Sequence, residues 1–201
     1  MTDHALRFLW VFRAAQHSSN RFWRLVLQRM REKYGLEISR STDIGPGLYL
    51  DHAFNITVNP AAIIGSNCNL HKGVTIGQEN RGKRKGAPVI GNCVWIGVNA
   101  TLVGRISVGN DVLIAPGAYV NCDVPSHSIV LGNPCRVIPR KNATEGYINR
   151  RCNFKNSFQL RRSYCMAQNK ILVTGAAGFI GAFLVKKLLE ETDDVIVGLD
   201  N

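Results

Sequence analysis

The central part of the sequence predicts a parallel β-helix, a coil built of short strands. From Ile90 to Val124 the chain falls into six-residue units, each of which begins with an aliphatic residue. A second apolar or small residue stands four positions after each lead, and glycine follows three of the leads. A period of six matches neither an α-helix nor a two-faced strand, so it indicates a structural repeat in which three units complete one triangular coil. The leads are Ile90, Ile96, Leu102, Val108, Ile114 and Val120.

The same period begins earlier in the chain. Its leads are Ile38, Ile44, Leu50 and Ile56 and then, after a slip of two residues at NITVNP, Val58, Ile64, Leu70 and Ile76. We expect a local irregularity at a corner of the coil there. The polar, glycine-rich stretch between Gly77 and Val89 predicts a loop that leaves the coil at one corner. A β-sandwich is the alternative fold, but its short strands rarely keep a fixed period.

Two helices are expected ahead of the coil, over residues 5–16 and over RFWRLVLQRMREKY. Ser18, Ser19 or Asn20 would cap the second helix, and Gly35 would end it. Its apolar face, formed by Phe22, Leu25, Val26 and Met30, is expected to pack on its own domain or on a sister subunit in preference to a membrane.

The C-terminal part of the chain changes character twice. Residues 141–165 are polar and aperiodic, which predicts a partly disordered linker. From Met166 a strand pattern, a glycine-rich turn, a helix pattern and a second strand follow one another, which is typical of the opening of a dinucleotide-binding fold. Its fingerprint residues are Gly175, Gly178, Gly181 and Asp200. Because only one βαβ unit is present, we expect NAD binding to be non-functional here. The domains are therefore 1–36, 37–140, 141–165 and 166–201.

Composition narrows the partners. With 25 Lys and Arg against 14 Asp and Glu, the chain of 201 residues carries a formal charge of +11, which favours an anionic ligand. No pattern of stacking aromatics accompanies the basic residues, so nucleic acid ranks below a small phosphorylated ligand. The six cysteines contain no CxxC pair, so we expect reduced thiols, a cytoplasmic location and no metal site. No apolar run approaches a membrane span, and we expect no stable membrane insertion.

Few side chains of the coil are candidates for chemistry. His52 lies at a corner beside Asp51, and a histidine oriented by a carboxylate is suited to act as a general base. A solvent-exposed corner histidine without a catalytic role is the competing interpretation. His71, about one coil further on, is a second candidate. The loop cations Arg81, Lys83, Arg84 and Lys85 are suited to hold phosphates, or else form a solvated basic loop.

Residues 37–140 resemble the hexapeptide-repeat acetyltransferases, and among them the serine O-acetyltransferase group. The matching stretches are IGPGLYLDHA, VTIG, APVIGNCVWIGVNATLVGRISVGNDVLIAPGAYV, DVPSHS and GNPCRVI. The resemblance implies a left-handed β-helix, a homotrimer with active sites between subunits, and acetyl transfer from acetyl-CoA to a hydroxyl. The expected fold class is therefore an all-β left-handed parallel β-helix with a short N-terminal helical segment and a truncated Rossmann-like βαβ tail.

The resemblance also implies roles for individual residues. His52 takes the position of the general base, Glu37 that of its partner acid, where the family usually has Asp, and Asp51 that of an acid used in acceptor binding. The positions implied for CoA are Gly77, Gly97, Val98, Ala115 and Pro116 in the groove, with Lys83, Arg84 and Arg136 in reach of its phosphates.

Two departures bear on the acceptor. The family's serine-binding Arg-His pair falls on Gly86 and Ala87, and the N-terminal helical domain is short. Shortened members of the family resemble the O-acetyltransferases of capsular and extracellular polysaccharide synthesis, so the expected acceptor is L-serine or a sugar. The tail from Met166 resembles the start of an NAD-dependent nucleotide-sugar epimerase, and we hypothesise that it joins two neighbouring genes. The alternative functions are a non-catalytic trimeric solenoid scaffold and, for the tail only, a remnant of that NAD-dependent sugar epimerase.

Overall fold

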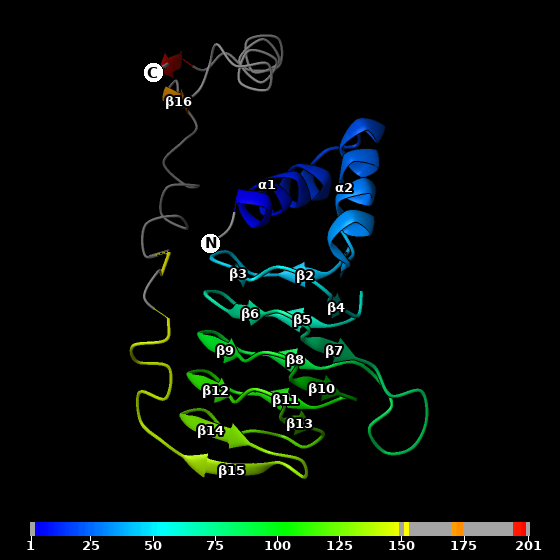
Figure 1. Ribbon diagram of the computed structural model, residues 1–201, viewed down its shortest axis with the longest axis vertical. Helices are drawn as coiled ribbons and strands as arrows, with labels where there is room; N and C mark the ends of the chain where they lie inside the picture. The colour runs from blue at the N-terminus through cyan, green and yellow to red at the C-terminus, as the bar shows by residue number, and fades with distance from the viewer. Residues whose placement is uncertain (1–2, 149–150, 153–169, 175–194, 200–201) are drawn as a thin grey trace, which may run out of the picture. The chain divides into compact units, whose positions relative to one another are not determined.

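The computed structural model describes residues 3–148, 151–152, 170–174 and 195–199. The chain divides into two compact units, Met1–Cys152 and Asn153–Asn201. The first unit is a solenoid of stacked coils with two helices at its N-terminal end, as Figure 1 shows.

Three sheets form the walls of the solenoid, and all their strands pair in parallel except β14 with β15. The five-stranded sheet has the order β1 (Leu36–Ile38), β4 (Ile56–Val58), β7 (Thr75–Gly77), β10 (Thr101–Val103) and β13 (Tyr119–Val120). The four-stranded sheet has the order β11 (Ser107–Val108), β8 (Val89–Ile90), β5 (Ile63–Ile64) and β2 (Asp43–Ile44). The six-stranded sheet has the order β15 (Arg136–Pro139), β14 (Ser128–Leu131), β12 (Val112–Ile114), β9 (Val94–Ile96), β6 (Asn69–His71) and β3 (Tyr49–Asp51).

The core of the solenoid consists of the repeat's lead residues. All six leads from Ile90 to Val120 are at most 2% exposed, and the earlier leads Leu50, Leu70 and Ile76 are fully buried. The aliphatic side chains of successive coils stack on one another, so each coil buries its interior only against its neighbours. The predicted parallel β-helix is therefore confirmed.

The phase slip is a longer corner in the first coil. Five residues separate Asp51 from Thr57, whereas three separate their strand partners His71 and Thr75. The two additional residues lie just ahead of NITVNP, in the corner that carries His52. The strands on both sides keep their register, so the irregularity is local, as the sequence predicts.

Both predicted helices are present, α1 (Asp3–His17) and α2 (Arg21–Tyr34). Asn20 is the N-cap of α2, accepting a hydrogen bond from the backbone N–H of Phe22, and Gly35 ends it in the left-handed conformation with φ 63°. Arg13 ties α1 to the first coil by donating to the carbonyls of Ile44 and Gly45. No helix among the described residues is long and apolar enough to cross a membrane.

The apolar face of α2 packs only in part. Val26 and Met30 pack against the core, whereas Phe22 and Leu25 are 51% and 56% exposed. Of the packing expected on the same domain or on a sister subunit, this protomer therefore shows only the part made by Val26 and Met30. Leu27 of α2 is buried, and α1 meets α2 through Trp10, whose ring centroid lies 5.0 Å from that of Trp23.

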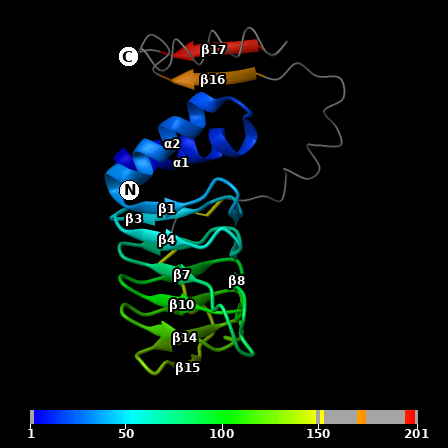
Figure 2. The same cartoon turned by 90° about the vertical axis from the view of Figure 1, so that its right-hand side faces the viewer.

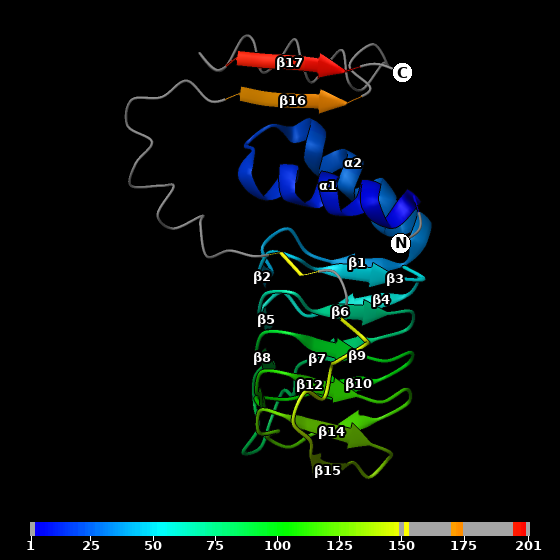
Figure 3. The ribbon, with the colours of Figure 1, turned by 90° about the vertical axis from the view of Figure 1, so that its left-hand side faces the viewer.

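The C-terminal end of the first unit folds back over the coils. Strand β15 turns antiparallel to β14 and closes the six-stranded sheet. Residues 141–148, here called the strap, then run back along the outside of that sheet, as Figure 3 shows. Ala143, Thr144 and Ile148 of the strap are buried. The first residues of the segment expected to be a linker are thus packed on the solenoid, and 153–165 lie outside the described residues.

The second unit is described only at two strands, β16 (Lys170–Thr174) and β17 (Val195–Leu199), which pair in parallel. Parallel pairing of these two segments is the arrangement that a βαβ unit requires. The glycine fingerprint and Asp200 lie outside the described residues.

Candidate active site

The solenoid has three edges where the chain passes from one sheet to the next. The first edge, between the six-stranded and five-stranded sheets, consists of residues 52–55, 72–74, 97–100 and 115–118. Backbone hydrogen bonds join successive corners, from Gly73 N to Phe54 O, from Asn99 N to Lys72 O and from Gly117 N to Val98 O. Residues far apart in the sequence are therefore stacked along one line.

The predicted base and four of the eight predicted CoA positions lie on this first edge. His52 occupies the corner of the first coil, and two and three coils further along stand Gly97–Val98 and Ala115–Pro116. Arg136 is paired with Leu131, where β14 turns into β15 at the end of the same edge. At Gly97 the backbone of the next coil lies too close for a side chain, because a Cβ on Gly97 would lie 2.6 Å from Pro116 N.

Asp51 lies between two histidines. Its Oδ2 is 3.9 Å from His52 Nε2 and 3.4 Å from His71 Nδ1. The side chain of His52 is 70% exposed, whereas that of His71 is 12% exposed. His52 has φ 45°, an uncommon conformation for a residue with a side chain, and the longer corner makes room for it. An imidazole open to solvent beside a carboxylate is suited to proton transfer.

The corner that carries His52 is supported by the N-terminal helices. His4 of α1 contacts the carbonyl of Ala53 through Nε2 at 3.1 Å, and its ring stacks on Tyr34 at 4.6 Å and contacts Phe54 at 4.7 Å. Tyr34 O accepts a hydrogen bond from Asn55 N at 3.1 Å. Sequence reasoning gave His4 no role, because nothing in the sequence shows that α1 covers this corner.

Glu37 is placed on the outer face of β1, beside Thr57 of β4. Its Oε2 is 3.5 Å from Thr57 Oγ1, and among the described residues it makes no ion pair with His52. Glu37 thus faces the start of the strand that follows the His52 corner, without contacting the imidazole in this protomer.

The cationic loop leaves the second edge, between the five-stranded and four-stranded sheets, as Figure 2 shows. Its base is closed by paired backbone hydrogen bonds between Glu79 and Gly86, each 2.9 Å. Arg84 is held by Glu79 at 3.1 Å, whereas Arg81, Lys83 and Lys85 are exposed. The loop therefore offers cations to solvent on an edge adjacent to the one that carries His52.

The conformation of the loop does not suit an arginine at Gly86, the position on which the arginine of the family's serine-binding Arg-His pair falls. Gly86 has φ 133°, and a Cβ at this position would lie 3.1 Å from Arg105 Cβ. A side chain there would strain the backbone and displace Arg105. The conformation of this loop is therefore built around glycine, and an arginine at Gly86 does not fit it.

Cys68 lies between β5 and β6, where the chain passes from the four-stranded to the six-stranded sheet, and it is not suited to nucleophilic chemistry. Cys68 is fully buried, and burial raises the pKa of its thiol to about 12, which leaves it protonated and inert.

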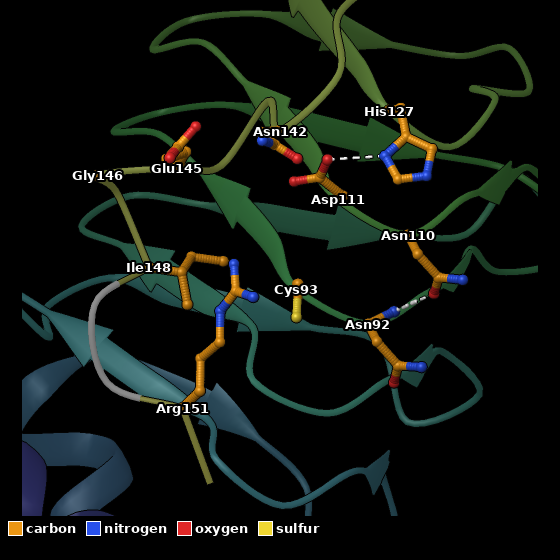
Figure 4. A pocket seen from close by; sticks show the side chains of 10 residues that line it. All are labelled: Asn92, Cys93, Asn110, Asp111, His127, Asn142, Glu145, Gly146, Ile148 and Arg151. Atoms are coloured by element: carbon orange, nitrogen blue, oxygen red, sulfur yellow. Dashed lines mark hydrogen bonds and ion pairs between the residues drawn. The ribbon is translucent and has the colours of Figure 1, made fainter. Parts of the chain in front are cut away.

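The third edge, between the four-stranded and six-stranded sheets, carries an open cleft of about 600 Å³ under the strap, drawn in Figure 4. Asp111 accepts hydrogen bonds from Ala143 N at 3.1 Å, Thr144 N at 3.0 Å and Thr144 Oγ1 at 2.7 Å, and it contacts His127 Nδ1 at 2.8 Å. Burial by itself raises the pKa of Asp111, but these hydrogen bonds outweigh burial and hold the pKa below its ordinary value. Asp111 is therefore the anchor of the strap.

The coil of hexapeptide repeats and the arrangement of its first edge define a left-handed β-helix protein of the hexapeptide-repeat transferase class. Among known proteins, serine acetyltransferase 2 of Arabidopsis thaliana is 35% identical over 136 residues, which cover 67% of this chain and 42% of that protein. Serine acetyltransferase of Helicobacter pylori is 34% identical over 117 residues, covering 58% of this chain and 68% of that protein. The chain belongs to the serine acetyltransferase family.

A solved structure agrees with this assignment. Serine acetyltransferase of Brucella abortus in complex with coenzyme A superimposes with a TM-score of 0.62 at 28% identity, over 69% of this chain and 57% of that chain. The left-handed β-helix predicted from the resemblance is thereby confirmed. The chain spans about a third to a half of the length of the first relatives that it matches.

The tail has a different relationship. A model of the NAD dependent epimerase/dehydratase family matches residues 171–201. The resemblance of the tail to the start of such an enzyme is therefore confirmed, and it concerns the second unit alone.

Proposed function

We propose that the protein is an acetyl-CoA-dependent O-acetyltransferase that acts on a small hydroxyl acceptor. The observation that carries the proposal is the solvent-exposed His52 beside Asp51, on the same edge as the positions that match the family's CoA groove. Membership of the serine acetyltransferase family supports the reaction type.

In the proposed mechanism, His52 removes the proton from the acceptor hydroxyl as the oxygen attacks the acetyl carbonyl. The tetrahedral intermediate then collapses, the thiolate of CoA leaves, and the proton held on His52 passes to that sulfur. Backbone N–H groups along the coil are proposed to stabilise the developing oxyanion. Glu37 is proposed to orient His52 when the site is assembled, and no cysteine nucleophile is required.

Acetyl-CoA is proposed to lie along the first edge. Gly97, Val98, Ala115 and Pro116 would line its groove, and Gly77, with Lys83 and Arg84 of the loop, would belong to the phosphate end together with Arg136. Since the loop and His52 leave different edges of one protomer, we propose a homotrimer in which the edges of neighbouring subunits complete each site. A cytoplasmic location is part of the same proposal.

The acceptor is proposed to be L-serine or a sugar, and the loop favours the sugar. The family pair that binds serine is replaced by Gly86 and Ala87, and Arg105 fills the space beside Gly86. A pocket without a fixed carboxylate partner loses its preference for an amino acid, because a buried carboxylate needs a paired cation.

Two measurements test this function. His52→Ala should lower acetyl-CoA turnover at least ~100-fold, the usual contribution of a positioned base, with the oligomer intact. His17→Ala, at the exposed end of α1, is the matched control and should retain wild-type turnover. Turnover with L-serine is compared with a panel of sugars and nucleotide sugars. Near wild-type turnover in His52→Ala, or CoA binding without thioester cleavage for any acceptor, would contradict the proposal, and the second result would favour a scaffold.

A further inference from the structure

His71 shares the carboxylate of Asp51 with His52, but it is placed quite differently. Asp51 and His71 are directly paired on neighbouring strands of the six-stranded sheet, so their side chains leave the same face. The contact from His71 Nδ1 to Asp51 Oδ2 is 3.4 Å, which is shorter than the 3.9 Å from His52.

The imidazole of His71 lies against a cluster of aromatic rings that continues to the strap. Its ring centroid lies 4.4 Å from that of Trp95, and Trp95 lies 5.0 Å from Tyr147. The strap is fixed at the same place by Asn69, whose Nδ2 donates to Tyr147 O at 3.3 Å. His71 is thus clamped between Asp51 on one side and Trp95 on the other.

The protonation of His71 follows from this environment. Burial lowers its pKa, His52 lowers it further, and the opposing effect of Asp51 is smaller than that of burial, so the ring is neutral at pH 7. Its Nε2 is buried without a hydrogen-bond partner among the described residues. The charged and titratable groups that face it are Asp51, His52 and, beyond Trp95, Tyr147. A lone pair directed at a carboxylate is unfavourable, so the single ring proton belongs on Nδ1, toward Asp51.

We propose that His71 is a positioning residue of the active site: as a neutral N–H donor fixed on Trp95, it holds the Asp51 carboxylate in place beside His52. The effect of His71 on turnover rests on the proposed function, whereas its contact with Asp51 does not. The enclosed Nε2 gives an acceptor no access to His71, so His71 is not the base; the open imidazole of His52 reacts.

The test compares His71→Leu, which fills the space without a donor, with His71→Asn, which keeps an N–H near the position of Nδ1. His71→Leu should lower kcat/KM about 10-fold, the contribution of one hydrogen bond to a charged group. The acid limb of its pH profile should move upward by roughly 0.5–1 pH unit. The Asp51 carboxylate, once freed from His71, moves toward His52 and stabilises the protonated form of the His52 imidazole. His71→Asn should stay within about 3-fold of wild type, since it keeps the donor.

The contact between His71 and Asp51 can also be tested by a measurement that does not depend on turnover. In protein with labelled histidine, the midpoint of the His52 NMR titration should rise in His71→Leu and return in His71→Asn; the His52 signal is identified by its loss in His52→Ala. An unmoved midpoint in His71→Leu, or equal loss of activity in both variants, would assign His71 a packing role only and overturn the proposal. If the wild-type protein acetylates no acceptor, the proposed function fails, whereas the titration still decides the contact.

Discussion

The attachment of the strap should depend on a single carboxylate. Replacing Asp111 by Ala removes the acceptor of three hydrogen bonds from Ala143 and Thr144 and the contact with His127. Hydrogen bonds to a charged group contribute about 1.5–3 kcal/mol each when taken singly. The three hydrogen bonds share the side chain of Asp111, so their contributions are not additive, and water can replace some of them because the strap lies at the surface. The expected cost of Asp111→Ala in the free energy of strap release is therefore about 3 kcal/mol.

Hydrogen exchange at the amide of Ile148 is the informative assay. This amide donates to Thr144 O, so its own partner survives the substitution and its exchange reports release of the whole strap. A cost of about 3 kcal/mol corresponds to roughly 100-fold faster exchange if local opening governs it.

Two variants serve as controls for Asp111→Ala. His127 is 60% exposed, so His127→Ala should cost at most about 1 kcal/mol and accelerate exchange no more than about 5-fold. Asp123→Ala removes a hydrogen bond to Ser107 N at the second edge and should leave the strap unchanged. Exchange at Ile148 at the wild-type rate in Asp111→Ala would show that apolar packing alone holds the strap, which would refute this reasoning.

Two further outcomes are expected. The folded-state pKa of Asp111 lies below its ordinary value of 3.8, so its contribution is complete above that value and is lost as pH falls through the folded pKa. The protection factor of the Ile148 amide, which is its intrinsic exchange rate divided by the observed rate, should therefore fall below about pH 4 in the wild type and not in Asp111→Ala. Leu102→Ala empties a fully buried position in the middle of the coil and should cost about 2–5 kcal/mol in urea unfolding, whereas Leu131→Ala, at a 40% exposed position, should cost less than about 1 kcal/mol. Equal midpoints for the two leucine variants would contradict the stacked core.

The coil itself was open to prediction because it is a local property of the sequence. Each hexad contains both its buried lead residue and its corner, and neighbouring coils are related by a fixed number of residues. Even the longer corner at His52 appeared as a slip of two in the phase of the leads. The caps of α2 at Asn20 and Gly35 are local in the same sense.

Contacts across coils were less accessible from sequence. His71 and Asp51 are 20 residues apart, and their pairing follows only once the register of β3 and β6 is known. The contacts between the rings of His71, Trp95 and Tyr147 can be predicted only if the return of the strap along the sheet is known as well. The sequence of the strap is polar and aperiodic and does not predict this packing; partly buried hydrogen bonds to Asp111 hold the strap on the sheet.

The sequence by itself determined the β-helix, its two flanking helices, the corner that carries His52 and the family resemblance, since all of these depend on residues close together in the chain. Only the tertiary structure decided that Asp51 is shared by an exposed and a buried histidine, that His4 supports the corner from α1, and that Gly86 leaves room for Arg105. Apart from that of Asp51 with the adjacent His52, these contacts join residues that are 19 to 49 positions apart. Their distances depend on how the coils stack, and the pattern of one coil contains no information on that.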